Sequence, residues 1–137
     1  MNSSQSSALW WLAASVLLTA VMWMPYIVNR ILEHGVWPAL RNPNHDQRPR
    51  AAWADRLMWA HQNAVENLVV FAPLVIAAHV LGASAATTAT AAAVYFFARL
   101  AHVVIYAAGI PLLRTLAFLV GFGAQVTVAV AVFGAAT

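Results

Sequence analysis

The sequence predicts an all-α integral membrane protein, a four-helix bundle in a lipid bilayer. Of its 137 residues, 63% are hydrophobic and only 8% are charged, whereas soluble domains contain about 25% charged residues. The mean hydropathy is +0.74, and a chain of this length has too little interior to hide so much apolar surface from water. Residues 1–29, 67–98 and 115–137 carry no charged side chain, and a membrane-spanning helix needs about 20 mostly apolar residues.

Four apolar segments are expected to span the membrane, at about residues 8–28, 57–81, 85–108 and 111–135 of a single domain. Pro25 is expected to kink the first helix or to mark its end. Glycine and proline favour turns, so Gly82-Ala83-Ser84 separates the second helix from the third, and Gly109-Ile110-Pro111 separates the third from the fourth. The first segment does not fit a cleaved signal peptide, because no positive charge precedes it and its apolar run is too long.

The long connection between the first two segments, about residues 29–55, is rich in proline and in arginine. Arginines 30, 41, 48, 50 and 56 lie in or beside it, whereas the second connection and both termini carry no lysine or arginine. The positive-inside rule therefore places this connection in the cytoplasm and both termini on the other side. Because so few charges are present, the sequence pI of about 10.2 does not indicate a nucleic-acid partner.

Polar side chains interrupt the second apolar segment, where they are costly in lipid and usually face a bundle interior or a polar cavity. Each helical residue turns by about 100°. Arg56, Asn63 and Asn67 are therefore expected to share one face, with Glu66 at its edge and His61 nearly opposite.

The third segment carries a second polar stripe, Arg99, His102 and Tyr106, whose spacing puts the three side chains on one helical face. Because Arg56, Arg99 and Arg114 all lie toward the cytoplasmic ends, the polar residues of three helices are expected to meet at one depth. Arginine binds carboxylates in a bidentate manner, so the cluster suits a zwitterionic ligand that bears carboxylates. Arg114 is also suited to stabilise a ligand thiolate.

The same residues also suit structural roles. Glu66 and Arg99 fit an ion pair between helices, Gln125 fits a link between helices, and His61 fits an interfacial or subunit contact. His102 fits a histidine bonded to a backbone carbonyl, and Tyr106 fits an interfacial aromatic. The chain has no cysteine, and its histidines lack the spacing of metal ligands, so no metal site is expected.

Three motifs together resemble the MAPEG family, the membrane-associated proteins in eicosanoid and glutathione metabolism. They are Ala60-His61-x-Asn63-x-x-Glu66, Arg99-x-Ala101-His102-x-x-x-Tyr106 and Arg114-Thr115. The resemblance covers most of the chain and is nearest to the small bacterial members. It implies a homotrimer in the bacterial inner membrane, with glutathione sites between neighbouring protomers that open toward the cytoplasm.

Position by position, the resemblance implies glutathione contacts at Asn63, Glu66, Arg99, His102 and Tyr106. Arg114 matches the arginine that stabilises the thiolate and is the expected catalytic residue, and Thr115 matches a hydroxyl residue of some members.

The chain departs from well-studied members at three positions. Trp59 and Gln62 stand where those members carry glutathione-binding arginines, and Phe118 stands where several carry tyrosine. Arg56, about one turn before Trp59, is the expected replacement and completes the ligand-binding set.

The function implied by the resemblance is a glutathione-dependent transferase or peroxidase, acting on lipophilic electrophiles or hydroperoxides that enter from the lipid. The cosubstrate is glutathione or another low-molecular-weight thiol, and no metal takes part. One alternative is a non-catalytic binding or structural protein on the same scaffold, which the changes at Trp59 and Gln62 favour. The other is a small transporter or channel, which the lack of a polar path through the membrane disfavours.

Overall fold

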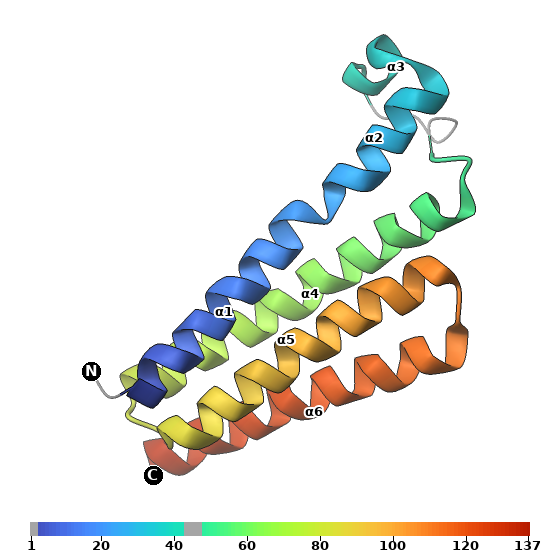
Figure 1. Cartoon of the computed structure of the whole chain (residues 1–137). Coiled ribbons are helices and arrows are strands. Elements are labelled where there is room, and N and C mark those ends of the chain that lie inside the picture. Colours follow the sequence, from blue (N-terminus) through green and yellow to red (C-terminus); the bar gives the residue numbers. More distant parts are fainter. Residues whose placement is uncertain (1–2, 43–47) are drawn as a thin grey trace.

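The computed structural model describes residues 3–42 and 48–137, and all regular structure in these residues is helical (Figure 1). The helices are α1 Ser3–Val21, α2 Trp23–His34, α3 Val36–Leu40, α4 Ala52–Val80, α5 Ala85–Ala108 and α6 Pro111–Ala136. Four helical stretches are long and apolar enough to cross a membrane, namely Ser7–His34, Ala52–Val80, Ala85–Ala108 and Pro111–Ala136. The predicted all-α membrane fold is therefore confirmed, and the chain is an integral membrane protein.

The first membrane span is interrupted at Met22, where α1 ends and α2 begins. Pro25 explains the interruption, because it lacks the N–H that would bond to the Val21 carbonyl four residues earlier. The span nevertheless continues to His34, farther than the expected end near Val28. The kink therefore tilts α2 without ending the span.

Helix α4 contacts the first span at the kink. The Tyr26 hydroxyl lies 2.9 Å from Nδ1 of His61, so a hydrogen bond joins α2 to α4. Met22 packs beside this bond against Leu57 and Ala60 of α4. His61, which the sequence suggested for an interfacial or subunit contact, thus has a partner within its own chain.

Helix α5 packs against α1, α4 and α6, and this packing forms the core of the bundle (Figure 1). The Phe71 ring on α4 stacks on the Tyr95 ring on α5 with 3.7 Å between centroids, and both side chains are buried. Ala91 and Ala92 of α5 are also buried, and such small side chains allow membrane helices to approach closely. These contacts form an apolar core next to the polar residues further along α5.

The turns around α5 follow from local chemistry. Ser84 caps its start, since the Ser84 Oγ accepts a hydrogen bond from the Thr87 N–H at 3.4 Å. Gly109 ends the helix with φ of +81°, a left-handed conformation that glycine adopts without strain. Pro111 then opens α6, where its missing N–H costs no helical hydrogen bond.

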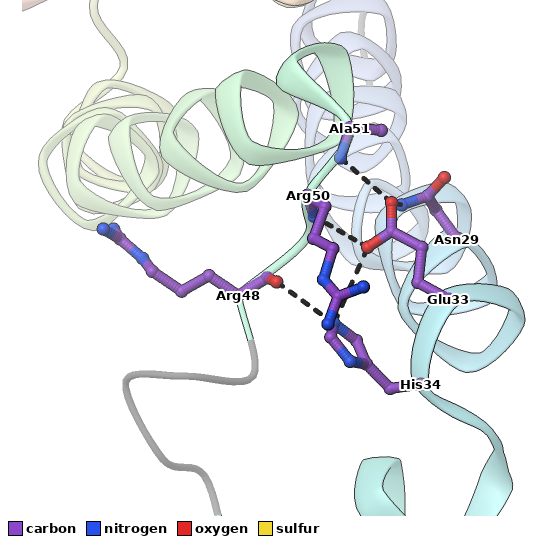
Figure 2. A network of polar contacts seen from close by, with 6 residues as sticks. All are labelled: Asn29, Glu33, His34, Arg48, Arg50 and Ala51. Carbon is purple, nitrogen blue, oxygen red and sulfur yellow. Dashed lines mark hydrogen bonds and ion pairs between the residues drawn. The ribbon is translucent and has the colours of Figure 1, made fainter.

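Helix α4 begins at Ala52, earlier than the expected Leu57, and a distant carboxylate holds the two residues that precede it (Figure 2). Glu33 at the end of α2 accepts hydrogen bonds from the backbone N–H groups of Arg50 at 2.7 Å and Ala51 at 2.9 Å. Asn29 Nδ2 also donates to this carboxylate at 2.7 Å. The bonds satisfy donors just before the first turn of α4, where no local side chain caps the helix.

Replacing Glu33 is expected to loosen this junction. In Glu33→Ala the N–H groups of Arg50 and Ala51 lose their acceptor, so their amide hydrogens should exchange faster while those in the middle of α4 stay protected. Hydrogen–deuterium exchange measures this directly. Asp55→Asn is the matched control, because the Asp55 carboxylate only approaches Arg48 Nε at 3.8 Å. Equal exchange in both variants would contradict the role of Glu33 in holding the residues before α4.

Candidate functional site

A cavity of about 210 Å³ opens where α4, α5 and α6 meet. Its lining is Asn63 from α4, His102 and Tyr106 from α5, and Arg114, Thr115 and Phe118 from α6. The structure thus brings five of the eight expected site residues to one place. Arg56, Glu66 and Arg99 do not line the cavity of the single chain.

Arg114 is the cation of the cavity. Its guanidinium carbon lies 4.3 Å from the centre of the Tyr106 ring, a cation–π contact that holds the side chain over α5. The Thr115 hydroxyl donates to the Pro111 carbonyl at 3.1 Å and keeps its lone pairs for a further donor. Within residues 3–42 and 48–137, no carboxylate lies within ion-pair distance of Arg114. The charge of Arg114 is therefore open to an anionic ligand.

Arg99 is buried behind the cavity, with 3% of its surface exposed. It donates through Nη1 to Asn63 Oδ1 and through Nη2 to Asn67 Oδ1, each at 3.1 Å. The rings of Tyr95 and Phe118 lie 5.2 Å and 5.1 Å from its guanidinium carbon. Arg99 is therefore held by two carboxamides and two aromatic rings rather than by a counter-ion.

The network around Arg99 orients Asn63. Because Asn63 Oδ1 accepts from Arg99, the amide group of Asn63 has its Nδ2 donors free for the cavity. Asn67 Nδ2 donates to the Asn63 carbonyl at 2.8 Å, and Gln125 Nε2 donates to the Asn67 carbonyl at 3.0 Å. Gln125 therefore links α6 to α4, as its structural interpretation proposed.

Gly121 of α6 makes room for the Arg99 guanidinium. A Cβ atom at Gly121 would lie 2.9 Å from Nη2 and 3.0 Å from Nε of Arg99, closer than van der Waals contact allows. Gly121 was not among the expected site residues. Its alignment with Arg114, Phe118 and Gln125 on one face of the fourth segment was the available signal.

Glu66 lies on the outward face of α4, where its carboxylate accepts a hydrogen bond from Gln62 Nε2 at 3.2 Å. It makes no ion pair with Arg99, so the alternative of an interhelical Glu66–Arg99 pair does not hold within one chain. A carboxylate exposed on a membrane-spanning helix needs a polar partner to avoid contact with lipid.

His102 forms the wall between Arg99 and Tyr106. It is 3% exposed and meets the Tyr106 ring edge-on, with 5.5 Å between ring centres. In the described part of the chain its buried Nδ1 has no hydrogen-bond partner. Buried polar atoms are normally satisfied, and the suggested bond to a backbone carbonyl is not formed at this atom.

The side chain of Arg56 bonds to the C-terminal end of α5. Its Nε donates to the Ala107 carbonyl at 2.9 Å, and its guanidinium packs against Gly109 in the following turn. Trp59, one turn later on α4, lies under the guanidinium of Arg48 at 4.9 Å. The two positions are thus occupied by contacts within the chain. No cluster of three or more metal-ligating side chains occurs among the described residues.

Comparison with known proteins agrees with this arrangement. A search of curated protein sequences found no match to the chain. The family model of the MAPEG family matches residues 8–134, nearly the whole chain. That family includes glutathione transferases and peroxidases as well as non-catalytic members. With its four membrane-spanning helices and its motifs in place, the chain belongs to the MAPEG family.

Proposed function

We propose that the protein is a glutathione-dependent membrane transferase or peroxidase that acts on lipophilic electrophiles or hydroperoxides. The observation that carries this proposal is the cavity that Arg114 lines together with Asn63 and Tyr106, with no carboxylate of residues 3–42 and 48–137 within ion-pair distance of the Arg114 guanidinium. Such a set binds carboxylates and amides of a peptide through charge-assisted hydrogen bonds. Family membership supports glutathione as the ligand.

Arg114 is the proposed catalytic residue. A guanidinium next to the bound cysteine sulfur favours the thiolate over the thiol, and the thiolate is the nucleophile. The proposed binding residues are Asn63, His102, Tyr106 and Thr115, which line the cavity, together with Arg56, Glu66 and Arg99, which do not line it in the single chain.

The size of the cavity supports assembly with further copies. Its volume of about 210 Å³ is below the roughly 300–1,000 Å³ of cavities that enclose a small ligand. Gln62, next to Asn63, and Glu66, about one turn after it, are exposed and available to a neighbouring protomer. A homotrimer in which a neighbour completes each site accounts for both observations.

The surroundings of Arg114 support an acceptor that arrives from the lipid. Leu112, Leu113 and Leu116 on α6 are all at least 47% exposed, so the arginine lies among apolar side chains that contact acyl chains. A lipophilic electrophile or hydroperoxide then reaches the thiolate without crossing water.

The arrangement of the ends supports an inner-membrane protein whose termini are both non-cytoplasmic. Figure 1 shows the two termini at the same end of the bundle, away from α3 and the arginine-rich connection. Glutathione from the cytoplasm then enters at the end of the molecule where Arg114 lies.

Turnover in proteoliposomes tests the proposal. We expect glutathione-dependent conjugation of a lipophilic aryl halide, or reduction of a lipid hydroperoxide. Failure of both reactions, with glutathione bound, would favour a non-catalytic member of the family. Trp59 and Gln62 stand where well-studied members carry glutathione-binding arginines, and in this chain they contact Arg48 and Glu66 instead. This observation favours the second candidate.

Tyr106→Phe is expected to raise the KM for glutathione with little change in kcat. The variant keeps the ring under Arg114 and removes one hydroxyl, and a neutral hydrogen bond of about 0.5–1.5 kcal/mol corresponds to a change of roughly two- to twelvefold. Steady-state kinetics with varied glutathione measure it. Tyr26→Phe is the control, because Tyr26 bonds to His61 away from the cavity. A KM equal to that of the parent would remove Tyr106 from the binding set.

A further inference from the structure

The end of α2 and the short helix α3 carry large apolar side chains that no other part of the described chain covers. The exposed fractions are 80% for Leu32, 56% for Val36, 76% for Trp37 and 71% for Leu40. The three residues on α3 are spaced i, i+1 and i+4, so they share one face of about 100°. Figure 1 places α3 at the tip of α2, far from both termini.

The length of the first span favours a position for these side chains beyond the hydrocarbon core. The first span has 28 residues, Ser7–His34, and a helix of that length measures about 42 Å. The hydrocarbon core of a bilayer is only about 30 Å thick. The last turns of α2, and α3 after them, therefore extend into the interfacial region, where tryptophan is favoured because its ring is apolar and its N–H is polar.

Two exposed arginines flank this apolar surface. Arg41 directly follows α3, and Arg50 lies two residues before the start of α4. Within residues 3–42 and 48–137 neither arginine forms an ion pair. The nearby carboxylates have other partners, because Glu33 bonds to Asn29 and to backbone N–H groups, and Asp55 approaches Arg48. Their positive charge is therefore complementary to anionic phosphates at the membrane surface.

We propose that Leu32, Val36, Trp37 and Leu40 form an interfacial anchor that inserts into the headgroup–acyl boundary of an anionic phospholipid membrane. Arg41 and Arg50 bind the lipid phosphates, which the planar guanidinium fits well. The Glu33 junction joins the anchor to the start of α4, because Glu33 holds the backbone of Arg50 and Ala51 (Figure 2). Lipid binding at the anchor therefore also positions the first turns of α4, the helix that carries Asn63.

Site-directed spin labelling tests the anchor, since the chain contains no cysteine. In proteoliposomes with phosphatidylglycerol, labels on Trp37→Cys and Leu40→Cys are expected about 5–10 Å below the phosphates. The depth is measured from the accessibility of each label to oxygen relative to its accessibility to a water-soluble nickel complex. Asn42→Cys is the matched control and is expected to lie in water. The label at Leu40→Cys should lie less deep when phosphatidylcholine replaces phosphatidylglycerol. When Arg41→Gln and Arg50→Gln are added to Leu40→Cys, the depth of the label should no longer depend on the lipid.

Three results would overturn the proposal. Equal nickel accessibility at positions 40 and 42 would show that α3 does not enter the lipid. A depth that does not depend on phosphatidylglycerol would exclude the role of the arginines. Protection of the labels in lipid-free detergent, with spin–spin broadening, would show that a second copy of the chain covers the surface instead.

Discussion

Arg114→Ala is expected to abolish the thiolate of bound glutathione while the protein keeps its fold. Arg114 contributes the cation of the cavity and contacts Tyr106 only through the face of the ring. Loss of a positioned donor that stabilises developing negative charge typically costs about 10²–10³ in kcat. We therefore expect turnover to fall by about that factor, measured in proteoliposomes with saturating glutathione, and circular dichroism to remain unchanged.

Arg48→Ala is the matched control for this prediction. Arg48 also places its guanidinium over an aromatic ring, 4.9 Å from Trp59, but it does not line the cavity. Its removal takes away the same charge and a similar contact at another place. Equal losses in the two variants would mean that net charge, rather than a positioned cation, supports the reaction.

Gly121→Ala is expected to disrupt the network that orients Asn63. The added methyl would lie 2.9 Å from Nη2 of Arg99, and this guanidinium is held by Asn63 and Asn67 and lies between two rings, so it has little freedom to move. Overpacking of this kind costs about 1–3 kcal/mol. We expect a lower melting temperature and weaker glutathione binding, measured by thermal denaturation and by equilibrium titration in detergent.

Gly123→Ala separates this effect from the general consequences of replacing glycine in a helix. Apart from its chain neighbours and the nearby backbone of α6, a Cβ atom at Gly123 would meet no atom of the described residues within 4 Å. The substitution brings the higher helix propensity of alanine, about 1 kcal/mol in soluble helices, without a clash. We expect it to leave stability unchanged or slightly higher. If both variants behaved alike, the close approach of Arg99 to Gly121 would have no energetic importance.

The membrane fold was predictable because it depends on composition, which can be read from the sequence without knowledge of tertiary contacts. Long apolar stretches without charge fit membrane spans, and their lengths indicate the number of spans. The stripe of His102 and Tyr106 was predictable for a related reason, since helical periodicity alone puts these side chains on one face. Arg114 joined them because the turn at Gly109 brings the start of α6 back beside the end of α5.

Side chains at the edges of a helical face were not predictable in the same way. Glu66 lies on the flank of the Asn63 face, and only the packing of α5 and α6 decides whether such a flank is covered. Arg56 shares the face of Asn63, but its long side chain bonds to the Ala107 carbonyl at the end of α5.

The contact of Glu33 with the residues before α4 also had no local signal in the sequence. Its partners on the backbone, at Arg50 and Ala51, are 17 and 18 residues away in the sequence. Contacts of this kind depend on where the chain returns, which periodicity does not encode.

The most direct test of the account is a titration of the detergent-purified protein with glutathione, followed by the ultraviolet absorbance of the thiolate. We predict a saturable thiolate signal in the parent protein that is retained in Arg48→Ala and lost in Arg114→Ala. Absence of any signal at millimolar glutathione would contradict the proposed thiolate site, and the non-catalytic role of the MAPEG scaffold would then be the better explanation of this chain.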